Sequence, residues 1–314
     1  MRRNHIALAV AAALASALAA PGAHADPPRP DTSGWTCKLC PFYTGASANV
    51  EAGVATAQGA NASFGRYSGI ARNGAYLEAG GHGHWRTKSG HYGSFDVERA
   101  GLASRRARVT EGREGRYELR LTYQGQPLRQ YDDTVTPYRS AGAGTLVLPS
   151  DWVSAGTTAG MTALGSSLER VRIESDRRTL ALSAKYFTSS VWTLFGTLSH
   201  SEQSGTGITG ASFLTEAAQL PEPIDYWTDT LEAGALWAGR QASLRLAYTG
   251  SWFHDDIDQL YFQNPYLSIV PESIGGLLSL PPDNDLQQVS ASGEIQLPFW
   301  SGALSYLASE GQLG

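Results

Sequence analysis

The chain has 314 residues and a formal net charge of −5, with 35 glycines, 14 tyrosines and 8 tryptophans. Only 17% of its residues are charged, whereas an ordinary soluble protein has about 25%. The negative balance excludes the basic footprint of a nucleic-acid-binding protein, and no apolar run after the N-terminal region is long enough for a helical membrane protein. A composition rich in glycine and aromatic residues is compatible with a fold made mostly of strands.

Residues 1–25 have the organisation of a secretory signal peptide. Arg2 and Arg3 form a positive start, residues 6–20 are apolar and rich in alanine, and an Ala-His-Ala cleavage site ends at Ala25. The apolar stretch is too short and too rich in alanine to span a membrane comfortably. We therefore predict cleavage after Ala25 and export of the rest of the chain.

The two cysteines, Cys37 and Cys40, lie in the segment 26–46, which we expect to be periplasmic. Attachment of haem needs a C-x-x-C-H motif, but Pro41 follows the second cysteine. A zinc site needs about four ligands, and the chain has no further cysteine to complete one. A local disulfide and an exchanging dithiol both remain open. The lack of a surrounding βαβ pattern favours a folding or docking role over redox catalysis.

Residues 47–314 are dominated by the alternation of apolar and polar side chains. In the segment 117–123 every second residue is apolar, and Glu118, Arg120 and Thr122 lie between them. A side-chain period of two is typical of a strand. No helical period continues for three turns beyond the signal peptide, so we predict an all-β fold. Further strands are predicted at 47–57, 91–99, 168–173, 180–186, 191–200, 228–237, 242–253, 286–297 and 300–309.

The connections between these strands are predicted to be of two kinds. The polar run 174–177 predicts a tight turn that joins the strands before and after it into a hairpin, and 238–241 predicts another. Segments 203–225 and 264–284, rich in glycine or proline, predict long loops. Transmembrane barrels alternate short and long connections in this way.

Aromatic residues lie near the ends of the predicted strands, where they would form the two interfacial girdles of a membrane barrel. In a soluble sandwich the same residues would belong to the core or its rim. Strands of about ten residues suit a tilted membrane span and exceed the usual length of about five or six in soluble proteins. The pattern favours an antiparallel outer-membrane β-barrel over a secreted sandwich. The aromatic residues are Tyr117, Tyr123, Tyr186, Phe187, Trp227, Trp237, Trp252 and Phe253.

Two groups of residues have some of the chemistry of a metal site. His82 and His84 share one face of a possible strand near His91, and residues 254–256 with Asp258 form an acidic group around a histidine. The first group lacks a carboxylate or cysteine at ligand spacing, and the second is more consistent with a solvated loop. No nucleophile, phosphate-binding or metalloprotease motif is present. We therefore predict no catalytic, metal or cofactor site and no enzymatic activity.

Three short strings border the predicted strands. They are Leu-Pro-Glu-Pro-Ile-Asp at 220–225, Tyr-Phe-Gln-Asn-Pro-Tyr at 261–266 and Leu-Pro-Pro-Asp-Asn at 280–284. Proline stops strand pairing and Asp or Asn forms local turns, so these strings predict rigid strand boundaries. Together with the signal peptide and the cysteine pair, they resemble the MtrB/PioB family of decahaem-associated outer-membrane β-barrels. The residues that carry the resemblance are Cys37, Cys40, Pro223, Ile224, Asp225, Asn264, Pro265, Pro281, Pro282, Asp283 and Asn284.

This resemblance implies a non-enzymatic role in electron transfer across the outer membrane. Members of the family form a wide barrel that sheathes a periplasmic multihaem c-type cytochrome, and electrons cross along the haems of that partner. The barrel itself carries no cofactor, contacts outer-membrane lipid, and has a cell-surface cytochrome as a possible further partner. A general porin or transport channel and a secreted β-sandwich adhesin are the alternative interpretations.

The length of the chain departs from the family pattern. Family members are much longer and have more strands than the roughly ten to twelve that the alternation predicts here. The sequence also ends in a polar tail at Gly314 rather than on the terminal aromatic residue usual in bacterial barrels. We expect the N-terminal part of a longer barrel, with a complete small barrel as the alternative.

Overall fold

The computed structural model describes residues 44–213, 216–266, 274–296 and 303–313. The predicted signal peptide and the pair Cys37 and Cys40 lie outside the described residues. Within them, helix is limited to α2 (Ala62–Gly65), α3 (Leu164–Ser167) and a single 3-10 turn, η1 (Thr158–Gly160). None of the helices in this part of the chain is long and apolar enough to cross a membrane.

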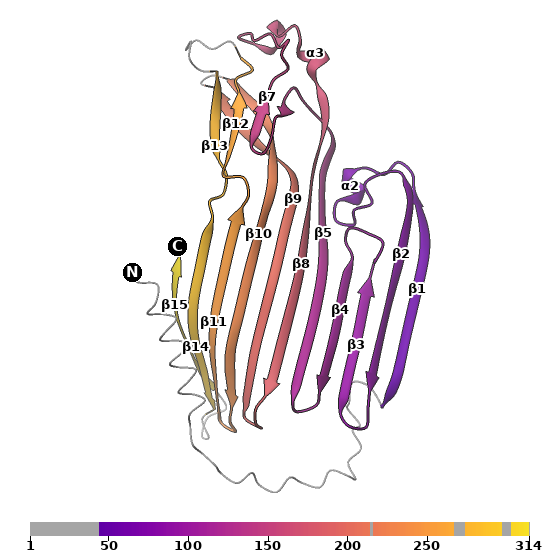
Figure 1. The fold of residues 1–314 in the computed structure, drawn as a ribbon, viewed down its shortest axis with the longest axis vertical. Coiled ribbons are helices and arrows are strands. Elements are labelled where there is room, and N and C mark those ends of the chain that lie inside the picture. The colour runs from indigo at the N-terminus through magenta and orange to yellow at the C-terminus, as the bar shows by residue number, and fades with distance from the viewer. Residues whose placement is uncertain (1–43, 214–215, 267–273, 297–302, 314) are drawn as a thin grey trace. The chain divides into compact units, whose positions relative to one another are not determined.

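In the described residues the main sheet has eleven antiparallel strands, arranged in the order in which they occur along the chain (Figure 1). Its two edges are β1 and β15, which do not pair with each other in the described residues, so the sheet is not closed. The predicted all-β class is confirmed. The strands are β1 (Gly45–Ala57), β2 (Gly74–Arg86), β3 (His91–Glu98), β4 (Arg106–Arg113), β5 (Tyr117–Thr136), β8 (Glu169–Phe187), β9 (Trp192–Phe213), β10 (Glu216–Ala238), β11 (Ala242–Asp255), β14 (Asn284–Gln296) and β15 (Ala303–Leu313).

The two ends of the main sheet differ in how they connect the strands. At the lower end in Figure 1, the turn end, successive strands are joined by tight turns such as the predicted one after Ala238, where Gly239 N donates to Ala242 O at 2.8 Å. At the opposite end, the loop end, the connections are longer and carry the helices and a second sheet. The predicted alternation of short and long connections is present except between β9 and β10, which end and begin at Phe213 and Glu216.

The turn predicted at 174–177 is wrong, because β8 runs unbroken through it. Ser175 pairs with Leu128 on β5 and with Gly205 on β9, so the strand has partners on both sides at this point. The polar run still alternates between the faces, with Ser175 and Arg177 on one side and Glu174 and Asp176 on the other. Polarity here marks a strand wetted on both faces, and the run lacks the Gly or Asn that a two-residue turn requires.

The long loop predicted at 203–225 is also wrong, because β9 and β10 continue as a hairpin through this segment. Pro221 and Pro223 pair with Ile208 and Thr206 of β9 although proline donates no hydrogen bond. The carbonyl of Asp225 accepts from Asp256 N, next to the end of β11. The odd-numbered residues of β10, which include both prolines, therefore point their N–H and C=O positions toward the β11 side. At the height of the prolines β11 has ended, so the missing N–H groups face an unpaired edge.

A second sheet of four short strands, in the order β13-β12-β7-β6, lies at the loop end. Its strands are β6 (Arg139–Ser140), β7 (Thr145–Val147), β12 (Gln259–Gln263) and β13 (Gly275–Ser279), so the loop predicted at 264–284 contains a strand. With the tips of β9 and β10 it encloses the main buried cluster, and we call this unit the loop-end lobe. The cluster is Tyr138, Leu146, Ala211, Leu220, Ile257, Leu260, Phe262 and Leu280.

The segment that carries α2 protects a free strand edge. Among the described residues, β5 has no neighbouring strand on that side beyond Arg106, where β4 begins, and Arg129 N donates to Arg66 O at 3.0 Å instead. Ala62 N donates to Asp132 Oδ2 at 3.0 Å, and Asn61 caps the helix by accepting from Phe64 N at 2.9 Å. The β1–β2 connection therefore satisfies backbone groups that an exposed edge would leave open.

Candidate functional site

One face of the main sheet is apolar, and the other described segments leave it largely uncovered. Leu119, Leu121, Leu180, Leu182 and Leu198 are between 42% and 54% exposed. A soluble sandwich would bury such residues against a second sheet. Exposed leucines on adjacent strands are instead expected where lipid is the solvent. One cross-strand row on this apolar face runs through Phe95, Val109, Leu121, Leu182, Leu198 and Leu231.

Aromatic residues border the apolar face at two heights. Along β10, Trp227 and Trp237 are ten positions apart, which corresponds to about 33 Å along the strand and about 25 Å of height at a tilt of about 40°. The apolar band of outer-membrane barrels has this height. The girdle toward the turn end contains Tyr117, Tyr186, Trp192 and Trp237, and the one toward the loop end contains Tyr123, Trp227 and Trp252.

The opposite face of the same strands is polar. Glu118 accepts from Arg120 at 3.1 Å and lies 3.8 Å from Lys185. Arg245 pairs with Glu232, and its guanidinium carbon lies 4.8 Å from the centre of the Phe195 ring. These charges lie between the two girdles in height, so they need water on their side of the sheet. An apolar outer face with a wet, charged inner face is the pattern of a barrel wall.

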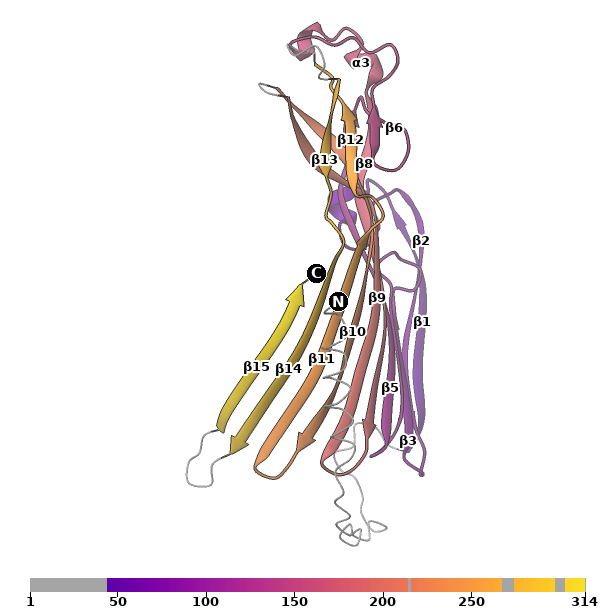
Figure 2. The same cartoon turned by 60° about the vertical axis from the view of Figure 1, so that its left-hand side comes forward.

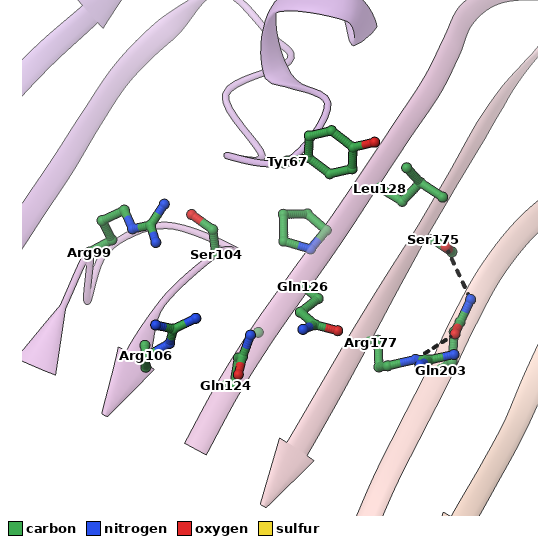
Figure 3. Close-up of a pocket in the computed structure, with 12 residues that line it drawn as sticks. Tyr67, Arg99, Ser104, Arg106, Gln124, Gln126, Leu128, Ser175, Arg177 and Gln203 are labelled. Carbon is green, nitrogen blue, oxygen red and sulfur yellow. Dashed lines mark hydrogen bonds between the residues drawn. The ribbon is translucent and has the colours of Figure 1, made fainter. Parts of the chain in front are cut away.

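Two hollows lie on the polar face toward the loop end. The first, the acidic hollow, has a volume of about 510 Å³, and its lining includes Glu51, Glu78 and Glu98. The second, the arginine hollow (Figure 3), has a volume of about 530 Å³ and adjoins the first, because Arg99 lines both. Its lining residues are Tyr67, Arg99, Ser104, Arg106, Gln124, Gly125, Gln126, Pro127, Leu128, Ser175, Arg177 and Gln203.

The loop-end lobe packs on the polar side of the β9–β10 hairpin. Thr197 on β9 and Thr228 on β10 lie on the polar face. Counting every second residue along the strands puts Ala211 and Leu220, both members of the buried cluster, on the same face. Figure 2 shows β12 and β13 beside the ends of the long strands. The lobe therefore extends over the side of the sheet that carries the charges.

Two of the three family strings meet at the end of β11. Pro223, Ile224 and Asp225 lie inside β10, so the strand boundary predicted at 220–225 is wrong. Asp225 O accepts from Asp256 N at 3.0 Å. The string 280–284 reaches the same point through Asp283.

Asp283 holds the end of β11 through two bonds. Its carboxylate accepts from Asp255 N at 2.9 Å and bonds His254 Nδ1 at 2.7 Å. Both groups lie beyond the girdle residue Trp252. The backbone bond and then the histidine lower the pKa of Asp283, and the carboxylate raises the pKa of His254. Burial raises the pKa of the neighbouring Asp255. Asn284 Nδ2 donates to Pro282 O at 3.2 Å, and Pro281, Pro282 and Asn284 lie in or next to this bend. The string at 280–284 thus fixes a strand boundary, as its sequence predicts.

The third string lies elsewhere, in the loop-end lobe. Asn264 Oδ1 accepts from Tyr266 N at 3.0 Å, and Pro265 O accepts from Trp152 Nε1 at 3.0 Å. Tyr266 in turn donates its hydroxyl to Ala217 O at 2.8 Å. These bonds join the connection after β12 to the β5–β8 connection and to the tip of β10.

The histidines do not assemble into a metal site. His82 and His84 lie on the polar face of β2, where His82 is the cross-strand partner of Asp96, but His91 has the parity of the apolar face on β3. Among the described residues, no group of three or more His, Cys, Asp or Glu side chains is placed to hold a metal ion. The group at 254–256 is instead organised by the ion pairs of His254 with Asp283 and with Asp256.

The arginine hollow was missed by sequence reasoning. Its three arginines come from separate segments, namely Arg99 after β3, Arg106 at the start of β4 and Arg177 in the middle of β8. Arg177 lies within the run 174–177, which predicts a turn and therefore no face. The register of β4, β5 and β8 shows that Arg106 and Arg177 share one side of the sheet.

The fold and its two faces define the class of protein. A sheet with a lipid-facing apolar band between aromatic girdles, and a charged opposite face, belongs to an outer-membrane β-barrel protein. The family model described as "Putative outer membrane beta-barrel porin, MtrB/PioB" matches residues 56–313, and the chain belongs to this family. The predicted resemblance and the outer-membrane location are thereby confirmed.

Comparisons with individual proteins add two findings. The chain is 30% identical over 299 residues to Outer membrane protein MtrB of Shewanella baltica (strain OS185), over 93% of this chain and 42% of that protein. The chain thus spans less than half the length of this relative. Among solved structures, the outer-membrane expressed OmpT of Vibrio cholerae aligns over 86% of this chain and 89% of its own, with 9% identity and a TM-score of 0.29.

Proposed function

We propose that the chain forms part of an outer-membrane barrel wall that sheathes a multihaem c-type cytochrome. The observation that carries this proposal is the division of the main sheet into an exposed apolar face and a charged polar face. Family membership and the 30% identity to an MtrB protein support the same role. The wall would hold the cytochrome, insulate it from lipid and give it access to the cell surface.

The width of the wall fits a lumen that holds another protein. Barrels of about eight strands are filled by their own side chains, and the bore widens with strand number. In the part of the chain that the structure describes, eleven strands lie side by side in a sheet whose edge strands do not pair with each other. The polar face presents mostly charged and hydroxylated side chains, which suit a hydrated contact with a soluble partner rather than a packed core.

We infer the orientation from the connections. Outer-membrane barrels have short turns on the periplasmic side and long loops outside. The turn end is then periplasmic, and the loop-end lobe lies at the cell surface, over the polar side. Its position would narrow the outer mouth of the lumen and leave the periplasmic mouth open to the cytochrome.

In this role the chain transfers no electrons and binds no haem of its own. The haems belong to the partner, and the sequence contains no C-x-x-C-H motif to attach one. We propose that Cys37 and Cys40 assist folding or docking in the periplasm. Replacing both with alanine should lower the amount of assembled barrel and leave the redox potentials of the haems unchanged.

Purification from the source outer membrane tests the proposal. The tagged chain is solubilised in detergent and captured, with a tagged general porin carried through the same steps as the control. We expect a protein with several covalent haems, detected by haem staining and Soret absorbance, to co-purify with the chain alone. Capture without haem, combined with ion conductance in planar bilayers, would instead establish a general porin. Extraction without detergent would establish a secreted protein.

A further inference from the structure

The arginine hollow is distinguished by its charge. Its twelve lining residues include three arginines and three glutamines but no carboxylate, although the chain has more acidic than basic residues, 29 against 24. Elsewhere on the polar face, Arg120 is paired with Glu118 and Arg245 with Glu232. The hollow therefore concentrates unbalanced positive charge on one part of the lumen wall.

Among the described residues, the three guanidinium groups have a single ion pair, the long one between Arg99 and Glu98. In the described part of the structure, Arg106 has no ion-pair partner, and Arg99 has only Glu98, at 3.8 Å. Arg177 donates from Nε to Gln203 Oε1 at 2.8 Å, and Gln203 donates in turn to Ser175 Oγ at 3.4 Å. This chain of bonds orients the Arg177 guanidinium and leaves its terminal nitrogens for a ligand (Figure 3).

The backbone also favours a role for Arg99. It is the one described non-glycine residue with a positive φ, 51°, a conformation that glycine adopts most readily. An arginine in this conformation places a long cationic side chain beside the hollow, as Figure 3 shows. A turn made only for connection would be better served by glycine.

The location of the hollow limits what can reach it. Gln124 and Gln126 of its floor follow Tyr123 of the loop-end girdle, so the hollow lies just beyond the membrane band. It opens on the polar face, away from lipid. A ligand must therefore come from the lumen or its outer mouth.

The sign of the charge on the lumen wall changes between the arginine hollow and the neighbouring acidic hollow. Arg99 lines both hollows, and Glu51, Glu78 and Glu98 lie on its far side. An acidic surface is attracted by the arginine hollow and repelled by the adjoining acidic hollow. Opposed charges of this kind fix the register of a protein partner more than they add affinity.

We propose that the arginine hollow binds surface carboxylates of the protein in the lumen and thereby fixes that partner at the outer mouth. This inference rests on the proposed function, since the occupant is the cytochrome that the barrel wall would sheathe. Guanidinium groups form paired, charge-assisted hydrogen bonds with carboxylates, and glutamine amides accommodate the remaining oxygens.

The test compares two triple variants of the tagged, co-purified complex. In the first, Arg99→Gln, Arg106→Gln and Arg177→Gln remove the charge of the hollow. In the control, Arg72→Gln, Arg105→Gln and Arg178→Gln remove equal charge from positions whose contacts or register lie on the other side of the sheet. Retention of the haem protein is measured as salt is raised.

We expect the hollow variant to bind the haem protein about tenfold or more weakly, with a smaller dependence of affinity on salt, and the control to match the wild type. Equal retention by all three proteins would overturn the inference and leave the proposed function standing. Absence of haem from the wild type would overturn both. Heat-modifiable electrophoretic mobility checks that each variant is folded. Arg106→Gln alone, which removes a guanidinium with no ion pair among the described residues, must also weaken binding of the haem protein.

Discussion

The membrane band and the loop-end lobe are built from the same strands but stabilised in opposite ways. On β9 and β10, Leu198 and Leu231 are cross-strand partners on the apolar face, and Leu198 is 54% exposed. Farther along β10, Leu220 is fully buried in the lobe. The band leaves its apolar side chains to the lipid, whereas the lobe has to build its own core in water. Exposed leucines in the band therefore do not indicate weak packing, because lipid rather than protein covers them.

The largest expected effect is a core truncation in the lobe. Leu260 is completely buried, so Leu260→Ala should destabilise the lobe by about 4–5 kcal/mol through lost burial and a residual cavity. Limited proteolysis of the loop end and denaturant unfolding measure the change. Leu277→Ala, at an exposed position on β13, is the control and should change little. Equal protease sensitivity in both variants would show that the lobe has no cooperative core.

A charge placed in the membrane band comes second. Leu198→Arg should cost about 2–4 kcal/mol, because it brings a cation to the lipid side near mid-height. Thr197→Arg places the same group on the polar face and should cost little. The free energy of folding into lipid vesicles compares the two. A cost that is equal for the two variants would contradict the assignment of the faces.

A smaller effect is expected where the two regions join. Arg129 is nearly buried and contacts Glu174 at 3.3 Å, Asp176 at 2.8 Å and Ser175 O at 3.0 Å. Arg129→Ala should destabilise the β5–β8 pairing above the band by about 2 kcal/mol, since it removes several charge-assisted bonds. Hydrogen exchange of the loop-end half of β8 reports the loss. Arg178→Ala, which changes an exposed arginine on β8, provides the comparison, and similar exchange in both would exclude a bracing role for Arg129.

The smallest effect is a pH dependence at the bend after β11. Because the pKa of Asp283 is lowered, its contribution to folding stability is complete above the ordinary aspartate pKa of about 4. That contribution is lost as pH falls through the lowered pKa. Because the pKa of His254 is raised, its contribution is complete below about 6.5 and is lost as pH rises through the raised pKa. The ion pair should therefore stabilise the bend most between about pH 4 and 6.5. NMR titration of His254 measures this, and Asp283→Asn should return its pKa toward the ordinary value; an unchanged titration would show that the pair does not form.

The two regions also differ in how much of them the sequence predicts. In the band, one face meets lipid and the other meets water, so strict alternation at 117–123 and 242–253 predicts the strands directly. Beyond the girdles both faces are wet, and the polar segments 174–177 and 203–225 lose the signal and resemble turns and loops. The prolines of β10 also favour the incorrect loop prediction. They are tolerated in the strand because β11 ends before it reaches them, and the sequence around the prolines does not show where β11 ends.

The sites divide in a similar way. The strings around Asp283 and Asn264 were predicted to set rigid boundaries, and local side-chain bonds at those residues have that effect. The arginine hollow depends on Arg99, Arg106 and Arg177, which only strand register brings together. Single-sequence patterns contain local turn chemistry but not the alignment of distant strands.

The central claim is that the apolar face meets lipid while the polar face meets a haem protein. Photoreactive side chains at Thr197 and at Leu198, adjacent positions on β9, test it directly in the intact outer membrane. We predict that position 197 cross-links a multihaem protein and that position 198 labels lipid alone. Haem-protein adducts from position 198, or none from position 197 when the cytochrome co-purifies, would contradict the claim.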